Sequence, residues 1–204
     1  MKIDLHTHSR CSDGSHSVEE LVIRAAENRI TTLSVTDHDT TESVSRTLTA
    51  GYRQGIEIIP GIEISAFDPE TERKIHILGY GYRPPAGALK HLCAPMLELR
   101  HENTVRQIAA ISEAGIELTE EEVRSEAGES SMLYKQHIMA VLVKKGYTDG
   151  IYSSLYTSLF KGNGVAAGDI TYVHYRDAIA AVLDDGGVPV LAHPGQQKCL
   201  DLVS

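Results

Sequence analysis

The sequence predicts an α/β fold built on a mainly parallel sheet. Short apolar runs typical of strands alternate along the chain with amphipathic stretches typical of helices. The chain has 204 residues, of which 42% are hydrophobic, so it can bury a core and fits one domain with a small insertion. Histidine and carboxylate side chains also recur where predicted strands end, and α/β barrels build their sites at strand ends.

The first part of the chain alternates strands with helices. Ser17 and Glu20 have the spacing of a capping box, which predicts that a helix begins at residue 18. The strands are short and apolar, and the one that contains Pro60-Gly61 is expected to continue through that pair. The expected strands are 2–6, 32–36, 57–64 and 74–80, and the expected helices are 18–28 and 41–53.

The segment 95–160 breaks this alternation. Successive helices without strands between them indicate a helical insertion, and a lid of this kind usually contributes to a substrate pocket. Residues 1–94 and 161–204 are expected to form the main body. The expected insertion helices are about 96–114, 119–126, 131–145 and 152–160, and the main body resumes with a helix over 174–186 and a strand over 188–192.

Composition excludes several classes of partner. The net charge of −9, without a long basic run, argues against binding of long nucleic acid. Three scattered cysteines, Cys11, Cys93 and Cys199, fit a reducing compartment and give no disulfide framework. The N-terminus has no signal-peptide core, and no apolar stretch is long enough for a bilayer. We therefore expect a cytoplasmic protein without a membrane partner.

One cluster of side chains predicts a metal site. His6 and His8 follow a short apolar strand, and their spacing of two sends both imidazoles to the same side. Imidazole and carboxylate together suit Zn, Mn or Fe, and a cluster of this kind usually performs metal-assisted hydrolysis. The candidate ligands are His6, His8, Asp13, His38, Glu63, His76 and His193.

Some neighbouring residues have two interpretations. Asp13 could be only a turn residue before Gly14, although the surrounding motif favours a ligand. Asp37 could cap the following helix or support a ligand histidine through a hydrogen bond, and Asp39 has the same two roles open. Cys11 is interpreted as a small packing residue, because a soft thiolate is unusual in such a ligand set.

Five short motifs occur in an order that resembles the PHP (polymerase and histidinol phosphatase) family. The likeness spans the whole chain and is greatest to small stand-alone members, which act on nucleotide phosphates and on the 5′ ends of short RNA. The motifs are His6-Thr7-His8 with Ser12-Asp13-Gly14, Thr36-Asp37-His38-Asp39-Thr40, Pro60-Gly61-Ile62-Glu63-Ile64, His76-Ile77-Leu78-Gly79-Tyr80 and Leu191-Ala192-His193-Pro194-Gly195.

The resemblance implies a distorted (β/α)7 barrel with two or three divalent ions, Mn, Fe or Zn, with Mg as an alternative. It implies one ion on His6, His8 and Glu63, with Glu63 bridging to a second ion that His76 and His193 hold. The implied third ion lies on Asp13 and His38.

The family closes its site with a late Asp-x-His pair, which does not follow His193 here. We therefore expect a barrel that lacks its last strands, as a truncated product or with its open edge covered in a homodimer.

The resemblance also suggests substrate contacts. Arg100 is similar to the family arginine that binds a phosphate, and a solvated helix charge is the alternative. His137 matches the histidine of a family Arg-Pro-His-Ile segment, in which the arginine is either replaced by Lys135 or lost here. Ser131 stands near the position of a phosphate-binding serine.

The expected function is hydrolysis of nucleotide phosphomonoesters through a metal-bound water. The substrates would be 3′,5′-bisphosphonucleotides, nucleoside monophosphates or the 5′ ends of short oligonucleotides. A metal-bound water, His193 or His137 could protonate the leaving alcohol. The alternatives are a phosphatase for histidinol phosphate or another small molecule, and a truncated, non-catalytic protein that binds metal or nucleotide.

Overall fold

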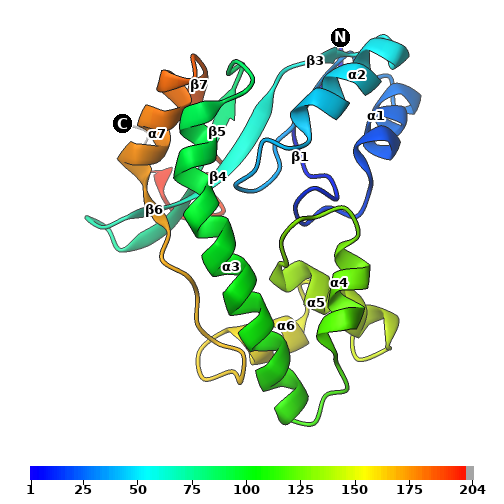
Figure 1. The fold of residues 1–204 in the computed structure, drawn as a ribbon, viewed down its shortest axis with the longest axis vertical. Helices are drawn as coiled ribbons and strands as arrows, with labels where there is room; N and C mark the ends of the chain where they lie inside the picture. The colour runs from blue at the N-terminus through cyan, green and yellow to red at the C-terminus, as the bar shows by residue number, and fades with distance from the viewer. Residues whose placement is uncertain (201–204) are drawn as a thin grey trace. The chain divides into compact units, whose positions relative to one another are not determined.

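The structure is a computed structural model that describes residues 1–200 (Figure 1). The chain divides into two compact units, one formed by Met1–Met96 with Tyr172–Ser204 and the other by Leu97–Thr171. The strands are β1 (Ile3–Thr7), β2 (Thr32–Val35), β3 (Glu57–Ile58), β4 (Gly61–Asp68), β5 (Arg73–Tyr80), β6 (Val173–His174) and β7 (Val188–Leu191). The helices are α1 (Val18–Glu27), α2 (Val44–Gln54), α3 (Gly87–Glu113), α4 (Glu120–Ala127), α5 (Lys135–Lys144), α6 (Ser154–Phe160) and α7 (Tyr175–Asp184).

A three-stranded sheet in the order β1-β2-β3 carries the N-terminal part of the first unit. All its pairs are parallel, as expected from the alternation of strands and helices. Helix α1 begins at the predicted capping box, in which Ser17 accepts from the Glu20 amide and Glu20 accepts from the Ser17 amide. The helices α1 and α2 cover this sheet through the buried side chains Val22, Ala25, Leu33, Val35, Ala50 and Ile56.

A four-stranded sheet in the order β6-β4-β5-β7 forms the rest of the first unit, with α7 packed against it (Figure 1). Strand β5 runs antiparallel to both β4 and β7, and only β6 pairs in parallel with β4. The expectation of a mainly parallel sheet is therefore correct for the first sheet and wrong for this one. Within residues 1–200 the strands belong to two sheets, and they do not form a closed barrel.

The single strand expected over 57–64 is two strands in different sheets. Strand β3 ends at Ile58 and β4 begins at Gly61, with Pro60 between them. Proline lacks the amide hydrogen that a central strand needs, so the chain leaves one sheet here and enters the next. A Cβ at Gly61 would lie 2.1 Å from the Ser34 hydroxyl oxygen, so only glycine permits this close crossing.

Helix α3 begins nine residues before the expected start at 96, and Pro95 lies inside it. The Asp185 carboxylate accepts hydrogen bonds from the amides of Ala88 (3.2 Å) and Leu89 (2.9 Å), which satisfies orphan donors of the first turn. Leu89, Cys93 and Met96 bury one face of this part of the helix. A cap that comes from 96 residues away in sequence cannot be recognised from local pattern.

The second unit is helical. Helix α4 begins with a capping box of Thr119 and Glu122, close to the expected boundary. Helix α5 begins at Lys135 rather than 131, with Tyr134 as its N-cap residue. The core of this unit includes Ile111, Leu118, Val123, Leu133, Ile138, Met139, Leu142 and Phe160.

Smaller differences occur near the C-terminal end. Helix α7 begins at Tyr175, and the preceding two residues form the short strand β6, which is too brief for a sequence pattern. Residues 194–198 form a turn after β7.

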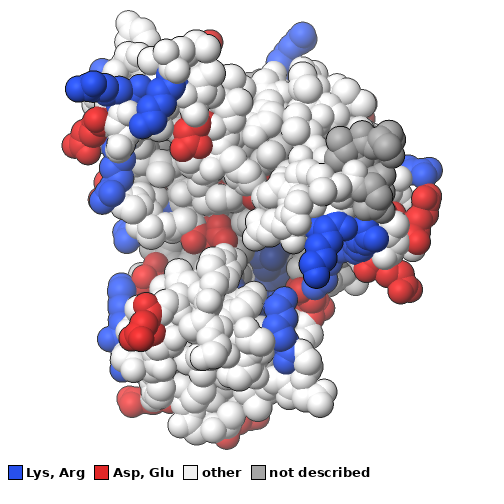
Figure 2. Space-filling view, turned by 180° about the vertical axis from the view of Figure 1, so that it is seen from behind, with Lys and Arg blue, Asp and Glu red and all other residues white. Residues whose placement is uncertain are grey.

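None of the helices within residues 1–200 has the length and apolar character that a membrane crossing requires. On the face shown in Figure 2, Lys and Arg side chains are interspersed with Asp and Glu. Surface ion pairs of the described residues include Arg46 with Glu19 and Arg176 with Glu70.

Candidate metal centre

The predicted ligands of the first unit converge on one carboxylate, Glu63. It lies in β4, where it pairs with Leu78 of β5 and forms an isolated bridge with His38, and it is 1% exposed. His6 is in β1 and His76 in β5, while His38 and His193 follow β2 and β7. The imidazoles therefore come from both sheets and meet at a single buried anion.

The Oε1 atom of Glu63 contacts two imidazoles. His76 Nδ1 lies 2.7 Å away, and His193 Nε2 lies 2.8 Å away. The main chain fixes this pair, because the Ala192 amide donates to the His76 carbonyl at 2.9 Å and the His76 amide donates to Gln197 Oε1 at 2.9 Å. Both imidazoles thereby have defined positions on the same carboxylate oxygen.

The Oε2 atom of Glu63 contacts three imidazoles. His6 Nε2 lies at 2.9 Å, His8 Nε2 at 3.0 Å and His38 Nε2 at 3.6 Å. Asp13 adds a second carboxylate, with its Oδ1 at 3.6 Å from His8 Nδ1. The imidazoles of the whole cluster are 16–31% exposed, so their edges stay open to a solute while Glu63 is buried.

The turn after β1 places Asp13 near His8. The amides of Ser12 and Gly14 both donate to the Ser9 carbonyl, at 3.1 and 3.0 Å. A Cβ on Gly14 would lie 2.2 Å from the His8 carbonyl oxygen, so glycine is required at this position. The His-x-His run and the following Asp-Gly therefore form one compact ligand-bearing segment.

His193 has an unusual backbone. Its φ of 25° lies in the left-handed region, which an L residue with a side chain rarely adopts. Strained residues of this kind concentrate at functional sites, where the surrounding structure holds them. Here the strain accompanies the contact between its imidazole and Glu63.

The charges at the cluster shift its pKa values. Burial by itself raises the pKa of Glu63, but hydrogen bonds from His6, His76 and His8 outweigh burial and hold that pKa far below its usual range. Burial lowers the pKa of His8, but its hydrogen bond to Glu63 and the charge of Asp13 together raise it above 6.5. Burial lowers the pKa of His38, which favours a neutral imidazole.

The donor set suits divalent transition ions. Neutral imidazole nitrogens and carboxylate oxygens all offer electron pairs, and a cation is the partner that satisfies several of them at once. Ligand atoms that lie within 4.8 Å of one another form two groups, His6 with Glu63 and His193, and His8 with His38 and Glu63. These groups differ from the expected assignment of ligands to particular ions, and that assignment stays a prediction.

The predicted substrate residues all belong to the second unit. Arg100 lies within α3, with its guanidinium over the Tyr134 ring at 5.3 Å. Lys135 is 3.5 Å from the Asp169 carboxylate, and Ser131 is exposed before α5. His137 is buried, and its Nδ1 accepts from the Tyr134 amide at 3.2 Å. Their contact with substrate stays a prediction.

Sequence reasoning missed two supporting contacts. The Gln197 side chain accepts from the His76 amide, and the Tyr80 hydroxyl donates to the Leu5 carbonyl of β1 at 2.8 Å. Burial, with the charge of Glu63 next, raises the pKa of Tyr80 to about 12, so this hydroxyl stays protonated. Tyr80 closes one of the motifs, but only the fold shows which carbonyl it reaches.

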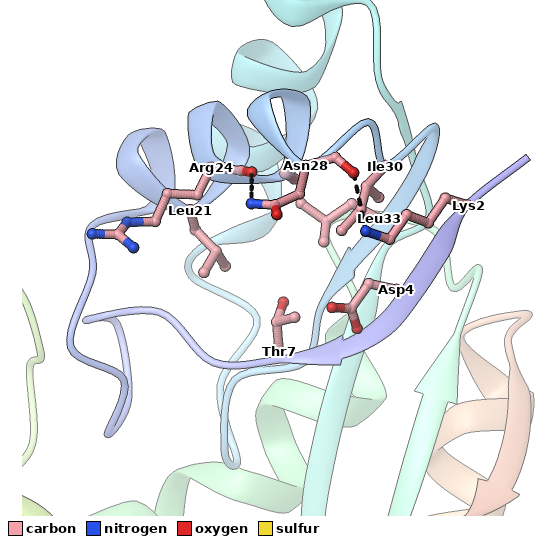
Figure 3. A pocket seen from close by; sticks show the side chains of 9 residues that line it. Lys2, Asp4, Thr7, Leu21, Arg24, Asn28, Ile30 and Leu33 are labelled. Carbon is pink, nitrogen blue, oxygen red and sulfur yellow. Dashed lines mark hydrogen bonds between the residues drawn. The ribbon is translucent and has the colours of Figure 1, made fainter.

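A separate cavity of about 330 Å³ lies between α1 and β1 (Figure 3). None of the seven candidate ligands is among its lining residues. The Lys2 ammonium donates to the Asn28 carbonyl at 3.1 Å, and the Asn28 side chain donates to the Arg24 carbonyl at 2.8 Å. These polar groups join β1 to the end of α1.

Comparison with known proteins identifies a family. The model of the PHP domain matches residues 4–185. The chain is 44% identical over 200 residues to the phosphoribosyl 1,2-cyclic phosphate 1,2-diphosphodiesterase of Eggerthella lenta, which covers 98% of this chain and 76% of that protein. It is 30% identical to the 3′,5′-nucleoside bisphosphate phosphatase of Chromobacterium violaceum, over 95% of this chain and 67% of that protein. It is 32% identical to the 5′-3′ exoribonuclease Rnm of Escherichia coli, over 95% of this chain and 65% of that one.

Solved structures are similar as well. A structure of an amidohydrolase from Chromobacterium violaceum, with bound sulfate and no metal, matches with a TM-score of 0.88 and 28% identity. A protein of Bifidobacterium adolescentis, proposed to be a metal-dependent phosphoesterase, matches with the same TM-score and 25% identity. Each match covers 96% of this chain and 68% of the other.

Proposed function

Because the chain belongs to the PHP domain family, we propose that it is a metal-dependent hydrolase of phosphate esters of small nucleotides. The observation that carries the proposal is the convergence of five imidazoles from four segments on the one buried carboxylate of Glu63. A structural histidine needs one partner, and five around one carboxylate are difficult to explain without cations.

Two or three divalent ions, with Mn, Fe or Zn as candidates, would neutralise the phosphate and supply an activated water when bound. Both ligand groups would share Glu63, because His76 and His193 face its Oε1 atom and the imidazoles of His6, His8 and His38 face its Oε2 atom. An ion near Oε2 would be bound by His8, His38 and Asp13. An ion near Oε1 would be bound by His76 and His193.

The role of His193 follows from its geometry. Its Nε2 faces Glu63 at 2.8 Å, so we assign it to ion binding. An imidazole that binds an ion through this nitrogen cannot also give up a proton from it. The expected protonation of the leaving alcohol therefore passes to His137 or to solvent, and His137 keeps this role as a prediction.

The proposed substrates are 3′,5′-bisphosphonucleotides, nucleoside monophosphates and the 5′ ends of short oligonucleotides. The named activities of the Chromobacterium violaceum and Escherichia coli relatives support this class. Arg100, Ser131 and Lys135 are the proposed phosphate contacts, because guanidinium, hydroxyl and ammonium groups all donate to phosphate oxygens.

A second candidate is hydrolysis of a cyclic phosphodiester on ribose. The Eggerthella lenta relative, at 44% identity over 98% of this chain, is a diphosphodiesterase of phosphoribosyl 1,2-cyclic phosphate. The same ion site would serve both reactions, because each transfers a phosphoryl group to water. The two candidates differ in the product, since the diester gives a ring-opened monoester before any phosphate is released.

A product-resolved screen tests the proposal. Protein reconstituted with Mn²⁺ is incubated with a bisphosphonucleotide, a nucleoside monophosphate, a 5′-phosphorylated oligonucleotide, phosphoribosyl 1,2-cyclic phosphate and histidinol phosphate, and products are followed by phosphate release and mass spectrometry. We expect turnover of a nucleotide or of the cyclic diester, and its loss in Glu63→Gln but not in His91→Ala, which alters an exposed helical residue. Faster turnover of histidinol phosphate, or equal activity of Glu63→Gln, would refute the proposal.

A further inference from the structure

We propose that Asp37 is a positioning residue that fixes the Asp13-bearing turn against His38 and thereby sets the ion affinity of one half of the cluster. This inference rests on the proposed ion site and assigns a role to a carboxylate that is not among the candidate ligands. Asp37 is 0% exposed, directly precedes His38, and uses both carboxylate oxygens within the protein.

Three hydrogen bonds connect Asp37 to the turn after β1. Its Oδ1 accepts from the Ser9 amide and from the Ser12 hydroxyl, each at 2.7 Å. Its Oδ2 accepts from the Ser9 hydroxyl, also at 2.7 Å. Hydrogen bonds to an ionised carboxylate are shorter and about twice as strong as neutral ones, and these lengths agree with that. The turn that carries Asp13 is therefore tied to the residue that precedes His38.

The backbone of Asp37 extends this connection to Glu63. The Asp37 carbonyl accepts from the Glu63 amide at 3.2 Å, and His38 and Glu63 form an isolated parallel bridge. One buried residue thus joins three segments that carry candidate ligands. The contacts reach the group of His8, His38 and Glu63, while His193 is outside them.

Asp39 provides an internal comparison on the other side of His38. Its amide donates to the Glu63 carbonyl at 2.9 Å, and its carboxylate accepts from the Ser65 amide at 2.7 Å and hydroxyl at 3.0 Å. These bonds hold the segment to β4 and do not reach the turn of Asp13. The two carboxylates therefore have different contacts: that of Asp37 binds the turn that carries Asp13, and that of Asp39 binds β4.

The variant Asp37→Asn keeps the shape of the side chain and removes its charge. Its carbonyl oxygen can accept from the Ser9 amide and the Ser12 hydroxyl, but its amide group then faces the Ser9 hydroxyl, which must reverse and accept. Changing a group that orients a metal ligand typically lowers affinity about tenfold to a hundredfold. We expect the ion affinity to fall by that factor at the site of His8, His38 and Glu63, and to change by less than about threefold at the site of His6, Glu63 and His193.

The experiment titrates metal-free full chain with Co²⁺, followed by visible absorption and calorimetry. His38→Ala and His193→Ala identify which class of site belongs to which ligand group. We expect Asp37→Asn to weaken the class that His38→Ala removes, and Ser12→Ala to weaken the same class less, because it removes one of the three bonds.

A matched control separates positioning from general stability. Asp68 is 1% exposed and also accepts from a backbone amide, that of Glu70, and from a hydroxyl, that of Thr71, in the β4–β5 hairpin. Asp68→Asn should lower the melting temperature without changing either Co²⁺ affinity. Equal losses at both classes in Asp37→Asn, or no loss in Asp37→Asn and Ser12→Ala, would overturn the inference alone. Wild-type protein that binds no Co²⁺ would overturn the proposed function and this inference with it.

Discussion

Replacement of Glu63 by Gln should remove most of the stabilisation that bound ions give to the fold. Glu63 belongs to both ligand groups, while His193 belongs to one. An ion present at one hundred times its dissociation constant stabilises the folded state by about 2.7 kcal/mol, so two ions contribute about 5 kcal/mol. For a chain of this size about 1 kcal/mol corresponds to about 2–4 °C, so saturating metal should raise the melting temperature of the wild type by about 10–20 °C.

The assay compares melting temperatures with and without Mn²⁺ or Co²⁺, measured by differential scanning calorimetry or by the fluorescence of a dye that binds unfolded protein. We expect most of the metal-induced rise to be lost in Glu63→Gln, because both groups lose a ligand. The rise should fall to about half in His193→Ala, because only one group loses a ligand. His91→Ala changes an exposed imidazole on α3 and should keep the full rise. A full rise in Glu63→Gln would show that the ions bind elsewhere and would refute this reasoning.

Four further outcomes follow from the structure. Metal affinity should fall as the pH is lowered, and the fall should begin above pH 6.5, because the raised pKa of His8 keeps a proton on a ligand nitrogen. Metal titrations at several pH values would detect this competition between the proton and the ion. Arg100→Ala should lower kcat/KM by about tenfold to a hundredfold if its guanidinium binds phosphate, and unchanged kinetics would exclude that contact. Asp185→Ala should cost about 1 kcal/mol of unfolding free energy in urea, because two amides at the start of α3 lose their acceptor. Val190 is 41% exposed on the edge strand β7, so a dimer formed along that edge should dissociate in Val190→Lys, as light scattering would show.

The sequence was sufficient to single out the candidate ligands because the pattern around each of them is local. His6 and His8 share a side through strand geometry, and the remaining candidates each follow or lie in a short apolar strand. The capping box of α1 is equally local, since Ser17 and Glu20 lie three residues apart. Features that depend on neighbouring residues in the chain were therefore predictable.

Features that depend on distant residues were not. The crossing between sheets at Pro60 requires the contact of Gly61 with Ser34, and the start of α3 requires Asp185. The pairing of β5 against both neighbours likewise arises from the tertiary arrangement, because strand pattern alone does not give direction. At Asp37 the sequence left two roles open, and only the folded turn shows that it supports Asp13 and His38.

Anomalous diffraction from crystals of the full chain grown with Mn²⁺ or Zn²⁺ tests the central claim most directly, because it locates each ion. The account predicts two peaks, each about 2.0–2.2 Å from a Glu63 oxygen, one of them shared with His6 and His193 and the other with His8 and His38. Ions bound away from Glu63, or a Glu63 carboxylate that keeps only its histidine contacts at saturating metal, would contradict it.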